Sequence, residues 1–137
     1  MTSHVPRVGL TTTEYADLAD RVAVTRSRFA GCVADIAASD RRPDAIATAI
    51  LAHLASVTAS ALPPAAQTLW SDRIARPLKT DPAKPLPARA VRGIASWPGA
   101  RIAGLVDALA EIEAILVETE NEARNEVFYA EFSRAYS

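Results

Sequence analysis

The hydrophobic residues of this chain recur at helical spacing, and the first clear run follows Thr11. Seven apolar or small residues return at alternating steps of three and four, which places them on one face of a helix. Thr11 and Glu14 have the spacing of a capping box at its start, and residues 39–43 are expected to end it. The stripe consists of Tyr15, Leu18, Val22, Thr25, Phe29, Cys32 and Ile36.

Two further helices are predicted before the middle of the chain. Residues 45–62 carry no formal charge, and Pro43 suits the first turn of a helix. Because alanine, serine and threonine dilute this run, we expect a buried central helix and no membrane span. The proline pair at 63–64 can start a third helix around Trp70. The buried face of the central helix is expected to comprise Ile46, Ile50, Leu54 and Val57.

Four prolines fall within residues 77–87 and predict an internal linker. Proline fixes the backbone and lacks an amide hydrogen, so this segment excludes a helix and favours extended or polyproline-like backbone. We expect the linker to carry the chain across the end of a helical bundle. A short helix around Val91 follows it, and no convincing strand pattern occurs along the chain.

The last predicted helix is too long for a compact domain. From residue 100 to Arg134 an uninterrupted helix is about 52 Å long, whereas a sphere of this many residues is about 37 Å across. The helix must therefore project, kink near residues 119–121, or belong to an elongated fold. We predict an all-α, elongated bundle of four to five helices in one domain, residues 1–137, with the first and last helices antiparallel.

The amino-acid composition says little about catalytic chemistry, but it favours a cellular compartment. The single cysteine, Cys32, excludes an intramolecular disulfide and lies among apolar residues, which fits a reducing environment. The N-terminal residues lack the apolar stretch of a secretory signal, so a cytoplasmic location is expected. Arginine outnumbers lysine 13 to 2, which is typical of proteins from GC-rich bacterial genomes.

The net charge of −1 hides two segments of opposite charge. Residues 73–101 have a balance of +6, and residues 107–131 have a balance of −7. The two surfaces can neutralise each other within one molecule or between copies, or the basic segment can dock on an acidic protein. The pattern argues against nucleic acid as a partner, because the positive charge does not extend over the domain. The candidate basic interface residues are Arg73, Arg76, Lys79, Lys84, Arg89 and Arg92.

Four of the eight aromatic residues lie in the last ten positions. Phe128, Phe132 and Tyr136 are spaced by four and share one helical face, and Tyr129 lies beside them. Two interpretations remain open. The cluster is either the end of the core, opposite Tyr15, or an anchor for a protein partner.

No catalytic constellation is present in the sequence, and no cofactor or metal is expected. His4 and His53 are the only histidines, and neither belongs to a metal-binding motif. Glu118, Glu122 and Glu126 form a carboxylate line that can hold Mg²⁺, but a solvated acidic face is the favoured explanation of this spacing.

These observations favour a non-enzymatic subunit or adaptor that assembles with itself or with a protein partner. Two alternatives stay open. One is a metal-dependent hydrolase, or an accessory subunit of an enzyme, that uses the acidic last helix. The other is a small helical regulator that binds a hydrophobic ligand among its alanine-rich helices.

Overall fold

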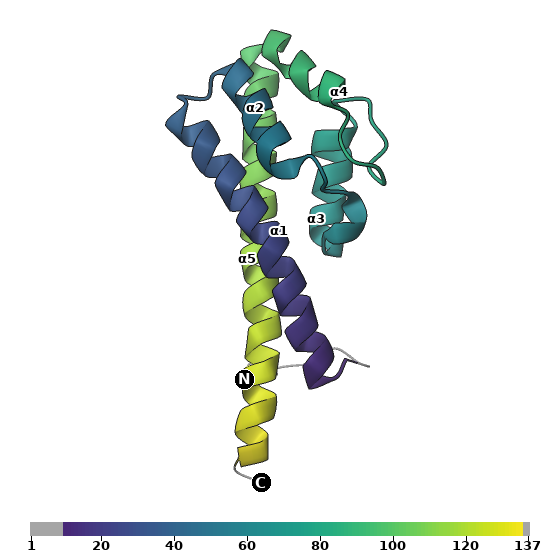
Figure 1. Ribbon diagram of the computed structural model, residues 1–137, viewed down its shortest axis with the longest axis vertical. Helices are drawn as coiled ribbons and strands as arrows, with labels where there is room; N and C mark the ends of the chain where they lie inside the picture. Colours follow the sequence, from purple (N-terminus) through teal and green to yellow (C-terminus); the bar gives the residue numbers. More distant parts are fainter. Residues whose placement is uncertain (1–9, 136–137) are drawn as a thin grey trace.

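The computed structural model describes residues 10–135, which form helices and turns without a strand in that range. Together these elements confirm the predicted all-α, elongated fold with a long C-terminal helix (Figure 1). The elements are α1 (Thr12–Ala38), α2 (Pro43–Leu54), η1 (Ala59–Ala61), α3 (Pro64–Leu69), η2 (Trp70–Ala75), α4 (Ala88–Arg92), η3 (Gly93–Ser96) and α5 (Gly99–Ala135).

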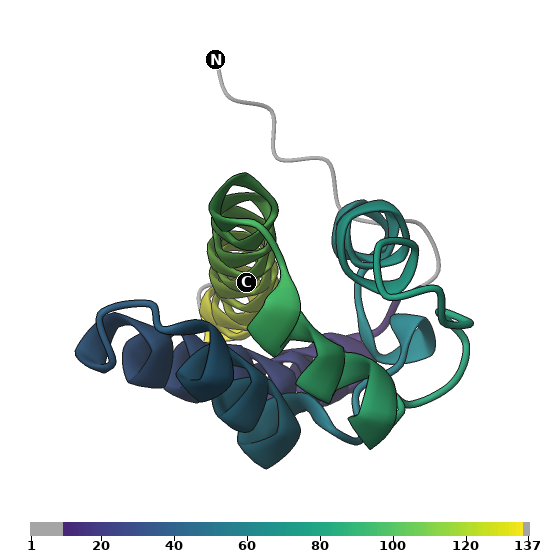
Figure 2. The same cartoon turned by 90° about the horizontal axis from the view of Figure 1, so that it is seen from above.

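Helix α5 is the axis of the molecule. Its 37 residues run without interruption, so no kink occurs near residues 119–121, and the helix is about 56 Å long. Helix α1 runs antiparallel along it, and their contact is the most extensive between any two elements (Figure 1). The elements of residues 43–96, called the head below, gather around the N-terminal end of α5 (Figure 2). The opposite end of α5 leaves the head as a narrow projection.

Helix α1 forms as its sequence predicts. The Thr11 hydroxyl accepts a hydrogen bond from the Glu14 amide at 3.1 Å, and the Glu14 carboxylate accepts one from the Thr11 amide at 3.2 Å. This reciprocal pair satisfies two amides that a helix start leaves open. The predicted stripe is buried except for Leu18, which is half-buried, and Ala19 is completely buried beside it.

The central helix is shorter than expected, because α2 ends at Leu54 instead of continuing to residue 62. Val57 and Leu62 are still buried, at 3% and 4% exposure, but a turn and the short η1 helix bring them into the core. The Ser56 hydroxyl accepts a hydrogen bond from Arg28, and the Ala59 amide donates to the Pro82 carbonyl at 2.9 Å. These contacts outside the helix compete with its continuation.

Aromatic packing fills the centre of the head. Trp70 and Phe29 are both fully buried, and their rings meet edge to face with centroids 5.9 Å apart. The backbone of η2 widens into a π-helix, so the Arg76 amide donates to the Ser71 carbonyl at 3.0 Å. The Trp70 indole N–H has no acceptor within the described part of the chain. Packing of the ring, and not hydrogen bonding, therefore holds this tryptophan.

Residues 77–87 contain no helix, yet side chains and backbone bonds attach them to the head. Leu78 and Leu86 are buried, at 7% and 5% exposure. The Arg101 guanidinium donates to the Pro77 carbonyl at 2.8 Å and lies over the Trp97 ring, 4.2 Å from its centroid. The proline segment is thus tied both to the core and to the first turn of α5.

None of the helices within residues 10–135 is long and apolar enough to cross a membrane. The uncharged run at residues 45–62 forms most of α2, a turn and η1, and its core residues are Ile46, Ala47, Ala49, Ile50, Leu54, Val57 and Leu62.

A glycine allows α1 and α2 to approach each other closely. The imidazole of His53 on α2 lies against Gly31 on α1, and its Nε2 is 2.6 Å from Oδ2 of Asp35. A Cβ atom at Gly31 would lie 2.8 Å from Cε1 and 2.9 Å from Nδ1 of His53. The histidine is therefore accounted for by helix packing.

We predict opposite effects for the same substitution in two helices. A Cβ atom added at Gly104 in α5 would have no such contact within 4 Å. Gly104→Ala should therefore raise the free energy of unfolding by about 0.5–1 kcal/mol, because alanine has the higher helix propensity. Gly31→Ala should lack this gain, because the His53 ring must move away from Asp35. Urea unfolding of both variants measures the difference, and adding His53→Ala should restore the gain at Gly31. Equal stabilisation by both glycine substitutions would contradict the close contact.

Candidate protein-interaction surfaces

The C-terminal aromatic residues are exposed, so the interpretation of this cluster as the end of the core is wrong for its described members. Phe128, Tyr129 and Phe132 are 60%, 52% and 52% exposed. Phe128 stacks on Phe132 with centroids 6.2 Å apart and meets Tyr129 edge to face at 5.8 Å. Tyr136, the fourth predicted member, lies outside the described residues. The three rings form a continuous aromatic surface on α5.

This surface lies where the contact between α1 and α5 ends. Near the start of α1, Tyr15 and Ala19 pack against Ala123 and the half-buried Val127. The last turns of α5 extend past the start of α1 (Figure 1), and residues 124–135 include no buried residue. These residues, called the α5 tip below, extend over about 18 Å.

A hollow adjoins the aromatic surface at the base of the α5 tip. It has a volume of about 270 Å³ and lies between α1 and α5, with Phe128 on one wall. Its lining residues are Ala16, Arg124, Val127, Phe128 and Glu131. An apolar ring beside a cavity with charged walls suits a partner side chain that inserts next to Phe128.

The predicted basic residues all belong to the head and are all exposed. They come from η2 and the turn after it, from the proline segment and from α4, which are successive parts of the head (Figure 1). None of them forms an ion pair with another residue of the range 10–135. These exposed basic residues of the head are Arg73, Arg76, Lys79, Lys84, Arg89 and Arg92.

The acidic side of α5 instead pairs with α1. Glu120 accepts hydrogen bonds from Arg26 of α1 and, at 3.1 Å, from Arg124 one turn further along α5. Arg124 also lies 3.7 Å from Asp20 of α1. Partial burial raises the pKa of the Glu120 carboxyl, but the hydrogen bonds and charges of the two arginines outweigh it and hold the pKa below 4.5. Glu120 is therefore a charged clamp between the two long helices.

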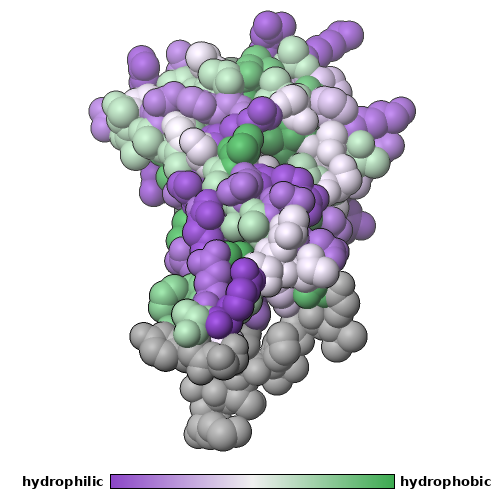
Figure 3. Space-filling view, turned by 60° about the horizontal axis from the view of Figure 1, so that its bottom comes forward, coloured by the Kyte–Doolittle hydropathy of each residue, from purple (hydrophilic) through white to green (hydrophobic). Residues whose placement is uncertain are grey.

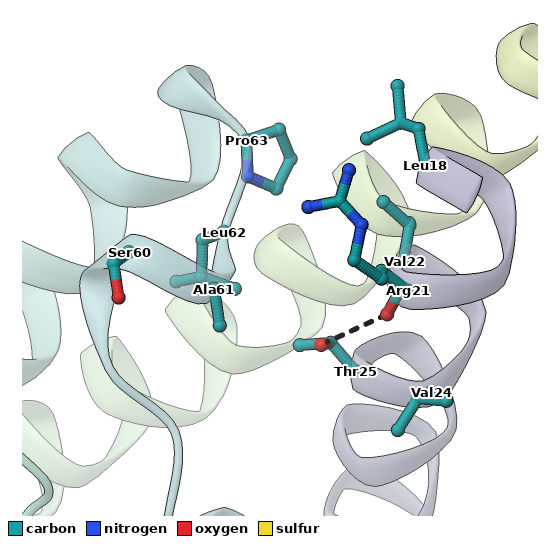
Figure 4. Close-up of a pocket in the computed structure, with 9 residues that line it drawn as sticks. All are labelled: Leu18, Arg21, Val22, Val24, Thr25, Ser60, Ala61, Leu62 and Pro63. Atoms are coloured by element: carbon teal, nitrogen blue, oxygen red, sulfur yellow. Dashed lines mark hydrogen bonds between the residues drawn. The ribbon is translucent and has the colours of Figure 1, made fainter. Parts of the chain in front are cut away.

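A groove opens between α1 and the chain that leads into α3 (Figure 4). It has a volume of about 480 Å³ and mostly apolar walls, with Arg21 at its edge. The Thr25 hydroxyl, which lines the groove, donates a hydrogen bond to the Arg21 carbonyl at 3.4 Å. Its lining residues are Leu18, Arg21, Val22, Val24, Thr25, Ser60, Ala61, Leu62 and Pro63.

The cysteine and the carboxylates of the predicted acidic line do not form a catalytic or metal site within residues 10–135. Burial, and to a lesser extent the charge of Asp35, raises the pKa of Cys32 to about 12, so the thiol stays protonated at neutral pH. Glu118 and Glu122 are exposed, and Glu126 is half-buried. Within residues 10–135 no three histidine, cysteine or acidic side chains come together as a metal site.

Comparison with protein-family models, with curated proteins and with solved structures gave no match to this chain.

The clamp at Glu120 should give the protein a pH-dependent stability. Because the folded-state pKa is lowered, the stabilisation is complete above the ordinary value of 4.5 and disappears as the pH falls through the folded-state pKa. Glu120→Gln should therefore lower the free energy of unfolding at pH 7 by about 1 kcal/mol, a modest value for partly exposed arginines.

Urea unfolding from pH 7 down to pH 3 tests this, since the two proteins should converge at the acidic end. Glu118→Gln, an exposed glutamate on the same helix, is the control and should match the unchanged protein throughout. A constant difference between Glu120→Gln and the unchanged protein at all pH values would show that the clamp is not ionic.

Proposed function

We propose that this protein is a non-enzymatic interaction or assembly subunit whose anchor is the aromatic surface of the α5 tip. The single observation that carries the proposal is the exposure of three adjacent aromatic rings, each more than half exposed, near the end of α5.

A partner that covers this surface would gain most of its binding free energy there. Large aromatic side chains dominate the binding energy of protein interfaces, and they lose little conformational entropy when they are covered. Figure 3 shows hydrophobic patches separated by hydrophilic side chains, so most of the visible surface is well hydrated. Phe128 and Phe132 form a stacked pair of exposed rings, which is typical of a contact site.

The helix end also suits a docking element mechanically. It belongs to an unbroken helix that starts inside the head, so its position relative to the head is fixed by the α1–α5 pair. A preorganised helix loses less entropy on binding than a segment that folds on its partner.

The double substitution Phe128→Ala and Phe132→Ala, called the tip variant below, tests this function. It should weaken association at least about tenfold, because one aromatic anchor contributes about 2 kcal/mol or more. Thermal unfolding should be unchanged or slightly improved, since both rings are half exposed and alanine favours helix.

Val117→Ala removes another exposed apolar side chain from the same helix and is the matched control. Association is measured by sedimentation velocity of the pure protein and by cross-linking capture from its source. If the tip variant and the control associate equally well with themselves and with captured proteins, the α5 tip is not the anchor.

The groove in Figure 4 favours a second function, binding of a small hydrophobic ligand. Its volume lies in the range of small-molecule sites, and the charge of Arg21 at its edge suits an amphipathic carboxylate. This site is distinct from the α5 tip, so the two functions can be tested separately.

Decanoate, a medium-chain fatty acid, should raise the thermal midpoint in proportion to the logarithm of its concentration above the dissociation constant. Ala61→Phe should abolish this shift, because Ala61 is exposed and lines the groove. Ala37→Phe, on an exposed position of α1 outside the groove, should leave the shift intact. The absence of any shift at millimolar decanoate would exclude this ligand class.

A further inference from the structure

The α5 tip has no net charge, and the order of its charges makes it complementary to itself. Its charged residues are two arginines and two glutamates, Arg124, Arg134, Glu126 and Glu131. Two copies of the tip can therefore approach each other without net repulsion. We propose that the partner of the α5 tip is the α5 tip of a second copy, in an antiparallel, twofold-symmetric contact centred near Phe128. This inference rests on the proposed function and names its partner.

One face of the α5 tip combines an exposed ring with two opposite charges. Arg124, Phe128 and Glu131 line the same hollow, so their side chains lie on one side of the helix. Seven residues make almost two full turns, which explains why Arg124 and Glu131 share this face. Phe128 lies between them, four residues after Arg124 and three before Glu131. A positive and a negative charge thus flank the ring at nearly equal distances along the helix.

An antiparallel contact turns this spacing into attraction. When two such helices run in opposite directions and cross at Phe128, Arg124 of each copy faces Glu131 of the other. The twofold axis repeats the pair, so one contact contains two pairs of opposite charge and brings the two Phe128 rings together. In a parallel contact each charge would instead meet its own copy, and like charges in an interface oppose association.

Both charged groups can accept a second partner. Glu131 is exposed, and its side chain forms no hydrogen bond or ion pair with another residue of the range 10–135. The Arg124 side chain is 50% exposed. Its contacts with Glu120 and Asp20 leave guanidinium N–H groups for another carboxylate, and they hold the side chain in place before binding.

The apolar part of the contact has room for a ring from the second copy. The hollow beside Phe128 has a volume of about 270 Å³, and Ala16 of α1 and Val127 form part of its walls. A ring that enters it is covered by both long helices. Phe132, which stacks on Phe128, comes next to Arg124 of the second copy in the same register, and an arginine can stack on an aromatic ring.

This contact predicts the size and shape of the particle. A twofold contact uses the same surface on both copies, so association stops at two chains. The α5 tip is only about 18 Å long, and a contact of this size is weak and reversible. The two heads lie at opposite ends, because each α5 extends about 43 Å from the centre of the contact to its start at Gly99. The dimer should therefore be at least about 85 Å long.

Glu131→Arg tests the pairing, because it places two arginines opposite each other at both ends of the contact. It should weaken dimerisation at least about tenfold. Glu111→Arg makes the same change of charge at an exposed position of α5 outside the tip, and this matched control should dimerise like the unchanged protein. Sedimentation equilibrium of the full-length proteins, over about a hundredfold range of concentration, measures the dissociation constants.

A mixture of two variants tests the antiparallel direction. Arg124→Glu alone should also dimerise poorly, but an equimolar mixture with Glu131→Arg restores both pairs of opposite charge and should dimerise like the unchanged protein. Circular dichroism verifies that Arg124→Glu, which loses its contacts with Glu120 and Asp20, is folded. Small-angle X-ray scattering of the unchanged dimer tests the direction independently, since a parallel pair has about the length of one chain.

Other outcomes overturn the inference, and they differ in what they leave of the proposed function. If the tip variant dimerises poorly but Glu131→Arg dimerises like its control, or if the dimer is no longer than one chain, the tips meet in another way and the proposed function survives. If the unchanged protein is monomeric but captures another protein that the tip variant does not, the partner is not a second copy. If the tip variant neither weakens a dimer nor loses a captured protein, the proposed function fails as well.

Discussion

The pairing of α1 with α5 is the contact on which the rest of the molecule depends. It joins the two longest helices, and every other element packs on one end of that pair. Toward the tip the pair has little hydrophobic thickness, since Ala19 and Ala123 form its centre together with Tyr15. Small side chains let the backbones approach closely, and the clamp of Arg26 and Glu120 fixes the helices where apolar contact is thin. Apolar packing and an ion pair therefore both stabilise the contact between α1 and α5.

Because α5 is longer than α1, its last turns extend past the end of the helix pair. Helix α1 has 27 residues and α5 has 37, so the antiparallel partner ends before α5 does. The extra turns cannot fold back, because no glycine or proline interrupts α5 after Gly104. The same rigidity that makes the fold elongated thus keeps the aromatic rings away from the core and holds them in a fixed direction.

Sequence patterns predicted most of the helices, but they did not predict where α2 ends or where the contact between α1 and α5 ends. The capping box and the α1 stripe follow local rules, so Thr11 and Phe29 behave as expected. The end of α2 depends on tertiary bonds at Ser56 and Ala59, which no periodicity encodes. Likewise, Leu116, Ala123 and Val127 continue one apolar face, yet Leu116 and Ala123 are buried and Val127, near the start of α1, is only half-buried. Periodicity identifies a helical face but not whether another helix extends far enough to cover it.

The charges of α5 are arranged for contacts rather than for the stability of the isolated helix. An acidic residue in the first turn would interact favourably with the helix dipole, but that turn contains Arg101 and no acid. The unfavourable interaction is at most about 1 kcal/mol, and the bond of Arg101 to the Pro77 carbonyl and its stacking on Trp97 offset it. Arg101 is thereby occupied within its own molecule, whereas Arg89 and Arg92 on the neighbouring helix have no ion pair among residues 10–135. Basic residues close in sequence thus serve different purposes, and only the outward-facing ones can hold a partner.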